Sequence, residues 1–177
     1  MITLVTNTKD EILKFFLDNP ITEIHLRELA RKTKVSFPWV RKIAKELVKE
    51  TLLIEKKERG FVLLSANGEN ILFKALKRGY NLYSLYSSEL VQTIIEVYSH
   101  PEAIILFGSY SRGEDTEQSD IDIAILTKKK LKIELKQYEK RLNRKISIKE
   151  IEKEKIEKEF LTTLANGIVL YGYFDIK

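Results

Sequence analysis

The chain has 177 residues, 44% hydrophobic and 32% charged, so it can bury a hydrophobic core beneath a heavily charged surface. It has no cysteine and two histidines, which excludes a disulfide framework and a thiolate zinc site. Oxygen atoms are therefore the expected ligands of any metal. No apolar run reaches the roughly 18 residues that a membrane span requires, and no secretory signal pattern opens the chain, so we expect a cytoplasmic protein with no membrane partner.

The charge is unevenly distributed along the chain. Residues 1–75 hold 14 Lys and Arg against 10 Asp and Glu, while the remainder holds 17 against 16. An anionic partner is therefore expected for the N-terminal part. Abundant Lys, Glu and Ile without cysteine is also typical of proteins from thermophiles, in which surface ion pairs become more favourable.

The N-terminal part predicts three helices followed by a β-hairpin. Apolar residues at helical spacing indicate helices over residues 8–17, 24–32 and 36–50, with Pro20 after the first and Pro38 in the first turn of the third. Short apolar runs at 52–55 and 61–64 flank a charged turn at 56–60, which favours a hairpin. This order is that of a winged-helix domain, which we predict over residues 1–67.

The C-terminal part predicts a small mixed sheet with helices. Residues 68–99 read as a helical connector, interrupted near Arg78-Gly79-Tyr80. Strands are then expected at 103–107, 121–126 and 145–148, and helices at 131–142 and 151–165, so the Lys/Glu run at 149–159 is interpreted as a solvated helix face. The expected fold class is therefore α/β (α+β), with the second domain over residues 100–177.

Two carboxylates in an isoleucine-rich strand carry the chemistry. Alternate residues of a strand point to the same face, so Asp120 and Asp122 project together while Ile121 enters the core. Two such carboxylates repel each other, and a divalent cation between them relieves the repulsion; Mg²⁺ favours carboxylate and phosphate oxygens. Gly108 lets the backbone pass close to a ligand, and Ser109 offers a hydroxyl to phosphate oxygens. Arg112 and Gly113 add a cation and a flexible position beside it.

The run from Gly108 to Gly113 followed by Ser119 to Ile123 resembles the minimal nucleotidyltransferases of the DNA polymerase β superfamily. The resemblance covers roughly residues 100–173 and includes Asn166 to Tyr171, which is similar to that family's closing segment. It implies transfer of a nucleoside monophosphate from an NTP, with ATP the first candidate, to a hydroxyl. It also implies that Ser109 and the Gly108 backbone hold the β and γ phosphates, and that Asp120 and Asp122 hold two Mg²⁺ ions.

One position departs from the family's pattern. The family supplies a third carboxylate from a following strand, and here that position is Ser147, which is a much weaker base and carries no charge. Glu150 is the nearest acid; it either replaces the missing carboxylate or is the first-turn acid of the next helix. The first hypothesis is an enzyme that nucleotidylates a protein or nucleic acid, as related antitoxins modify a partner toxin. The second is a transcriptional regulator whose degenerate transferase domain senses a nucleotide.

The first domain resembles the winged-helix DNA-binding domains of prokaryotic regulators. Its third helix and wing carry the expected nucleic-acid contacts, which are Ser36, Trp39, Arg41, Lys42, Lys45, Lys56, Lys57 and Arg59. Each of these Lys and Arg side chains is also compatible with an ordinary solvated surface charge. Trp39 is also compatible with packing against the wing. Such domains also serve protein docking and dimerisation, so a homodimer and a protein acceptor stay open as partners beside DNA.

Three further positions are interpreted as structural. His25 is expected at a helix start and His100 in a turn before the first strand of the second domain. Tyr80, Tyr83 and Tyr86 recur every three residues, which favours one packed helix face over a stacking platform or an acceptor for nucleotide transfer.

Overall fold

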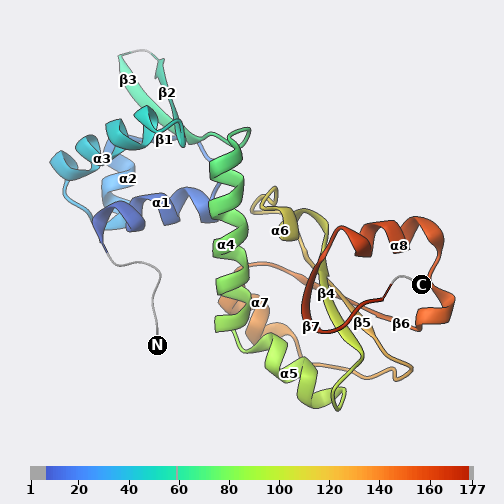
Figure 1. Cartoon of the computed structure of the whole chain (residues 1–177). Coiled ribbons are helices and arrows are strands. Elements are labelled where there is room, and N and C mark those ends of the chain that lie inside the picture. Colours follow the sequence, from blue (N-terminus) through green and yellow to red (C-terminus); the bar gives the residue numbers. More distant parts are fainter. Residues whose placement is uncertain (1–6, 59, 176–177) are drawn as a thin grey trace. The chain divides into compact units, whose positions relative to one another are not determined.

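The computed structural model describes residues 7–58 and 60–175, and the chain divides into two compact units, Met1–Leu76 and Lys77–Lys177. Figure 1 labels their helices and strands. Each unit combines helices with one sheet, so the mixed α/β class expected from the sequence is confirmed. Among the described residues, no helix is both long enough and apolar enough to cross a membrane.

The first unit packs three helices against a small antiparallel sheet. The helices are α1 (Thr8–Asp18), α2 (Leu26–Thr33) and α3 (Phe37–Lys49), and the strands β1 (Ile24–His25), β2 (Leu53–Glu58) and β3 (Phe61–Ala66) lie in the order β1-β3-β2. Asn7 caps α1, because its side chain accepts hydrogen bonds from the Lys9 and Asp10 amides. Phe16, Leu29 and Leu47 are fully buried and form the centre of this unit's core.

Two predicted boundaries in the first unit were wrong. The second helix begins two residues later than expected, because Ile24 and His25 pair with β3 as a short strand. The hairpin strands are longer than expected: the β2–β3 ladder continues to Glu58 and Phe61. Lys56 and Lys57 therefore lie within β2 and not in the turn. As successive residues of a strand, they place their side chains on opposite faces of the sheet.

The second unit is a four-stranded sheet with helices on both faces. Its elements are α5 (Leu90–Val97), β4 (Ala103–Phe107), α6 (Gly108–Arg112), β5 (Ile121–Leu126), α7 (Lys136–Leu142), β6 (Ile146–Ile151), a 3₁₀ turn η1 (Lys153–Lys155), α8 (Lys158–Ala165) and β7 (Ile168–Gly172). The strand order is β6-β5-β4-β7; β5 and β6 are parallel and the other pairs are antiparallel.

The two faces of this sheet bury different side chains. Ile104, Ile121 and Ile123 pack with α5 and α7 on one face, whereas Ile105 and Ala124 pack with α8 on the other. Figure 1 shows α8 set apart from α5 and α7 in this way. Central strands buried on both faces need apolar residues throughout, which explains the nearly unbroken isoleucine and leucine runs of β4 and β5.

The helical connector breaks at a different place from the one predicted. Helix α4 (Ile71–Ser87) runs without interruption through Gly79, and the chain turns only at Glu89, which has φ +70°. An interior glycine lowers helix stability by only about 1 kcal/mol, so the buried side chains around it, such as Phe73 and Leu85, are sufficient to keep the helix intact.

Three elements at the end of the chain also differ from prediction. The helix expected at 131–142 covers only α7; residues 131–135 precede it without regular structure, and the Leu131 amide there donates to the Glu150 carboxylate at 2.6 Å. The strand expected at 145–148 continues to Ile151, so the Lys/Glu run at 149–159 is the end of β6, the turn η1 and the start of α8, not one helix face. Strand β7 was not predicted.

Candidate active site

The turn between β4 and α6 is built around a glycine that no other residue can replace without movement. Gly108 has φ +74°, a conformation that side chains other than glycine's rarely adopt. A Cβ atom at Gly108 would lie 2.6 Å from Oδ2 of Asp122. The backbone of Gly108 therefore lies directly against the Asp122 carboxylate.

The carboxylate pair lies at the start of β5. Ile121 and Ile123 are fully buried, so the intervening Asp122 points to the opposite face, where it is half-buried; Asp120 precedes the strand and is exposed. Burial raises the pKa of Asp122, and the negative charge of Asp120 raises it further. Burial and the neighbouring charge both make the ionised form of Asp122 less stable, and a cation bound to the carboxylate would offset both effects.

The other residues of the motif lie on or after α6. Ser109 is half-buried in the first turn. Arg112 is exposed, and its Nε donates to Glu114 at 2.7 Å in an exposed and therefore weak ion pair. Gly113 has φ +71° and ends α6, which gives it a conformational role. Contacts of these residues with a nucleotide stay predictions.

Ser147 occupies the position beside Asp122 on the next strand. In the parallel β5–β6 ladder the two residues are paired, and residues paired in this way have their side chains on the same face of the sheet. Ser147 is exposed. The strand neighbour of Asp122 is thus a hydroxyl, in agreement with the interpretation that a third carboxylate is missing there.

Glu150 does not supply the missing charge. It pairs with Ile125, three residues along β6 from Ser147, so the alternation of the strand turns it to the face opposite Asp122. There its carboxylate accepts hydrogen bonds from the Tyr98 hydroxyl and the Leu131 amide, both at 2.6 Å. Glu150 also lies within β6 and not in the first turn of a helix, so both interpretations of this residue were wrong.

The donor set is limited to the carboxylate pair. Within residues 7–58 and 60–175, no three His, Cys, Asp or Glu side chains are grouped so that they could hold a metal ion. Two carboxylates still suit Mg²⁺, which keeps several waters and is commonly held by one or two carboxylates together with substrate phosphates. The residues present therefore fit a magnesium ion that arrives with a nucleotide.

A buried polar cluster beside this site was missed from the sequence. Asp115 is 1% exposed, although its acidic neighbours Glu114 and Glu117 give this stretch of the sequence the look of an exposed turn. Its carboxylate oxygens lie 3.1 Å from Lys77 Nζ and 3.7 Å from Arg144 Nη2, and it accepts a hydrogen bond from Asn81 at 2.7 Å. Asn81 also donates to the Tyr110 carbonyl of α6 at 3.0 Å. The cluster holds α4, α6 and the segment leading to Asp120 in one arrangement.

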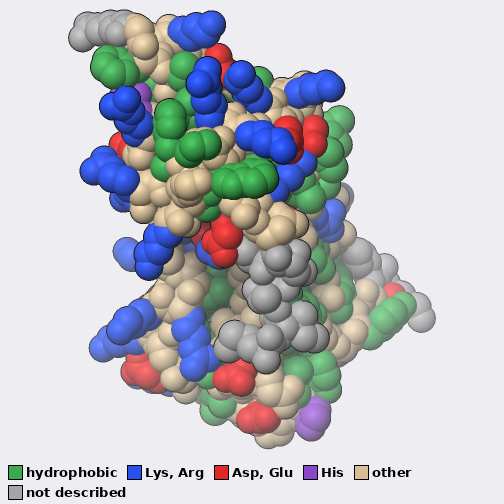
Figure 2. Space-filling model, turned by 90° about the vertical axis from the view of Figure 1, so that its left-hand side faces the viewer, with side chains coloured by type: hydrophobic (Ala, Val, Ile, Leu, Met, Phe, Trp, Pro, Cys, Tyr) green, Lys and Arg blue, Asp and Glu red, His purple; other side chains and the backbone are tan. Residues whose placement is uncertain are grey.

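The candidate nucleic-acid contacts lie in the first unit, as predicted from their residues. Ser36 directly precedes α3; Trp39, Arg41, Lys42 and Lys45 are exposed along it, and Lys42 Nζ lies 5.0 Å from the centre of the Trp39 ring. Trp39 is 55% exposed, so it does not pack as a core residue against the wing. Figure 2 shows Lys and Arg side chains interspersed with hydrophobic ones over this unit.

In the β2–β3 hairpin, Lys56 and Lys57 are exposed on β2, and Lys56 Nζ lies 3.6 Å from a Glu58 carboxylate oxygen. Arg59 lies outside the described residues. Whether any of these side chains contacts nucleic acid stays a prediction.

The residues interpreted as structural have structural contacts. His25 directly precedes α2 and packs edge-on against Phe61 at 5.4 Å between ring centres. His100 has φ +59° in the turn before β4, and its Nδ1 is hydrogen-bonded to the Tyr171 hydroxyl at 2.8 Å. Tyr86 donates to the Leu170 carbonyl at 2.8 Å, which ties the end of α4 to β7.

Comparison with known proteins gives one match. The family model described as "Polymerase beta, Nucleotidyltransferase" matches residues 89–173, a span that runs from just before α5 to just after β7 and contains Gly108, Asp120 and Asp122. No curated protein and no solved structure matches the chain.

Proposed function

We propose that the second unit, in which residues 89–173 match the nucleotidyltransferase family model, transfers a nucleoside monophosphate from a Mg-NTP to a hydroxyl of a macromolecule. One observation carries the proposal. The half-buried Asp122 carboxylate lies beside the exposed Asp120 and against the Gly108 backbone, where a side chain would collide with it. A carboxylate pair held in this way suits magnesium-assisted phosphoryl chemistry.

The roles of the residues follow from this arrangement. Asp120 and Asp122 would hold Mg²⁺, with two ions expected from the family, and the metal would neutralise charge on the phosphates and lower the pKa of the attacking hydroxyl. Ser109 and the Gly108 backbone would bind the β and γ phosphates. The acceptor oxygen forms a bond to the α-phosphorus, the bond to the bridging oxygen breaks, and pyrophosphate leaves. The acceptor proton passes to water, because Ser147 cannot take it at neutral pH.

In the first unit, we propose a winged-helix module that brings the transferase to a nucleic acid or to a protein partner. The support is the row of exposed cations and Trp39 along α3, together with the positive charge of residues 1–75. ATP as the preferred nucleotide, a toxin as acceptor and a homodimer are the more detailed forms of this proposal.

A second candidate function is favoured by the missing third carboxylate. With Ser147 beside Asp122 and Glu150 on the other face, the unit could bind Mg-NTP without turning it over and report nucleotide to the first unit. This candidate is a nucleotide-sensing regulator.

The deciding experiment compares four proteins with each α-³²P-labelled NTP, Mg²⁺ and cell lysate: wild type, Asp120→Asn/Asp122→Asn, Ser147→Asp and Ser147→Asn. We expect slow wild-type transfer and none from the double variant. Ser147→Asp should raise the rate about 10²-fold, the lower end of the usual contribution of a general base, and the uncharged Ser147→Asn should not.

Saturable Mg-NTP binding with no transfer by wild type or Ser147→Asp would overturn the enzyme and leave the sensor. If Mg-dependent binding is also unaffected in Asp120→Asn/Asp122→Asn, the site itself is wrong under both functions.

A further inference from the structure

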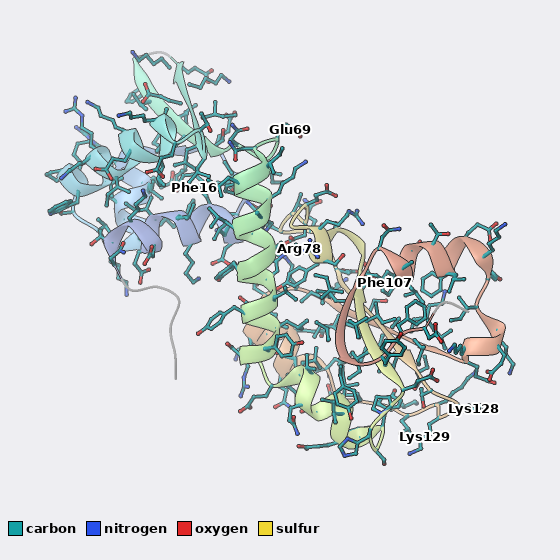
Figure 3. All side chains as sticks on the ribbon, in the orientation of Figure 1. Phe16, Glu69, Arg78, Phe107, Lys128 and Lys129 are labelled. Carbon is teal, nitrogen blue, oxygen red and sulfur yellow. The ribbon has the colours of Figure 1, made fainter. Side chains whose placement is uncertain are left out.

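A hollow of about 320 Å³ lies at the end of β5 and β6 away from the carboxylate pair. Its lining comes from the segment after β5, from β6, and from η1 and α8, and consists of Thr127, Lys128, Lys129, Lys130, Lys149, Glu150, Ile151, Glu152, Lys155, Ile156, Glu157 and Phe160. Figure 3 labels Lys128 and Lys129 at this end of the sheet, far from α6. Lysines outnumber glutamates in the lining, so the hollow is basic.

The pairings within the hollow leave a positive excess. Glu150 is engaged by the Tyr98 hydroxyl and the Leu131 amide, and Glu152 accepts a hydrogen bond from Lys155 at 2.8 Å. The hydrogen bond from Lys155 lowers the pKa of Glu152, and the charges of Lys155, Lys128 and Lys130 lower it further, so three cations act on one carboxylate. An anion is the complementary ligand.

Part of the hollow's lining lies on the same face of the sheet as the candidate active site. Lys149 follows Ser147 by two residues and shares its face, so it lies roughly 7 Å along β6 from the level of Asp122. Its Nζ lies 3.9 Å from the centre of the Phe160 ring, and Phe160 packs edge-on against Phe107, the residue before Gly108. One row of side chains thus connects the basic hollow with the carboxylate pair.

We propose that this hollow binds backbone phosphates of a single-stranded nucleic acid whose terminal hydroxyl is the acceptor at Asp122. The inference rests on the proposed transferase function and names its acceptor class. A single-stranded nucleic acid carries one phosphate per nucleotide. The hollow offers several cations in succession, from Lys149 to the segment Lys128–Lys130. Lysines are common phosphate ligands. In the reaction, the terminal hydroxyl oxygen bonds to the α-phosphorus of the NTP, pyrophosphate leaves and the proton passes to water.

The test measures the affinity of the full chain for a fluorescent single-stranded RNA 12-mer over a range of salt concentrations. All proteins carry Arg41→Ala/Lys42→Ala/Lys45→Ala, so that the cations proposed for the first unit do not mask the result. Lys128→Ala/Lys149→Ala removes two cations of the hollow. Lys136→Ala/Lys140→Ala removes two exposed cations of α7, which covers the other face of the sheet, and is the matched control.

We expect Lys128→Ala/Lys149→Ala to lower the slope of log affinity against log salt by about 1.4, since each phosphate contact on a single strand contributes about 0.7. The control should keep the slope, and Mg-ATP binding should be the same in all three proteins. Equal slopes in the three proteins would overturn the proposal. So would a Lys128→Ala/Lys149→Ala variant that keeps its RNA affinity but binds pyrophosphate or an acidic peptide more weakly. Failure of the transferase itself would appear separately, as Mg-ATP binding that Asp120→Asn/Asp122→Asn does not change.

Discussion

Two aspartates near the start of β5 are removed from water in opposite ways: Asp115 precedes the strand and Asp122 lies in it. Asp115 is fully buried with two cations and an amide around its carboxylate, whereas Asp122 is half-buried with another carboxylate as its charged neighbour. A buried charge that its surroundings neutralise acts as a structural tie. A partly buried charge whose neighbours destabilise its ionised form is left available for a ligand. This difference distinguishes the structural Asp115 from the candidate site residue Asp122, seven residues later.

The comparison predicts its largest effect at Asp115. Asp115→Asn should lower the free energy of unfolding by about 3–5 kcal/mol, because Lys77 and Arg144 are left as buried cations without their counter-charge. The measurement is urea denaturation followed by circular dichroism. The matched control is Glu114→Gln, an exposed neighbour whose loss should change stability by less than about 1 kcal/mol. Equal losses in the two variants would show that the cluster is not a structural tie.

The next effect is expected at Gly108. Gly108→Ala should lower the free energy of unfolding by about 1–3 kcal/mol for the strained backbone and should also abolish Mg-dependent nucleotide binding, because the new Cβ displaces the Asp122 carboxylate.

Gly60→Ala supplies the control for Gly108, since Gly60 has φ +80° but nothing within 4 Å of an added Cβ. It should show the backbone effect alone and retain nucleotide binding, measured by calorimetry. Retention of binding by Gly108→Ala would mean that Asp122 can move without loss of the site.

The smallest effect is expected at Asp122 itself. Asp122→Asn should leave the metal-free protein as stable as wild type or more stable by up to about 1 kcal/mol, since the charge that it removes is partly solvated. The folded pKa of Asp122 is raised, so wild type loses stability relative to the variant as pH rises through that pKa, and the two should converge below pH 3.8, the ordinary value of an aspartate. Thermal melts between pH 3 and 8 give the difference directly. A variant that is less stable at neutral pH would show that Asp122 is neutralised by the protein.

Local patterns were sufficient to predict the strands that carry the site. β4 and β5 were located to the residue, because β4 is a continuous apolar run and β5 is interrupted only by Asp122. The placement of Asp122 on the face opposite the two buried isoleucines followed from strand alternation. Ser147 was identified through the resemblance to the nucleotidyltransferases, and it pairs with Asp122 from the next strand.

Features that depend on remote partners could not be predicted in this way. Asp115 looks like a surface residue among Glu114 and Glu117, and only the arrival of Lys77 and Arg144 from other elements makes it a core residue. Likewise, residues 131–135 have helical spacing in the sequence but form no helix, and their Leu131 amide donates to Glu150, a residue of β6. In both cases a tertiary contact between residues far apart in sequence outweighs the local preference.

Strand β7 has a consequence for the order in which the sheet can assemble. Its residues Ile168–Gly172 pair with β4, and Gly167 and Gly172 approach the Leu106 and Glu102 carbonyls too closely for any side chain. Until this late segment is synthesised, one edge of Ala103–Phe107 presents backbone N–H and C=O groups without hydrogen-bond partners, in a segment of uncharged, β-forming residues. During synthesis, β4 of the nascent chain can therefore pair with a strand of another molecule. Pairing of β7 with β4 occupies this edge and prevents such contacts.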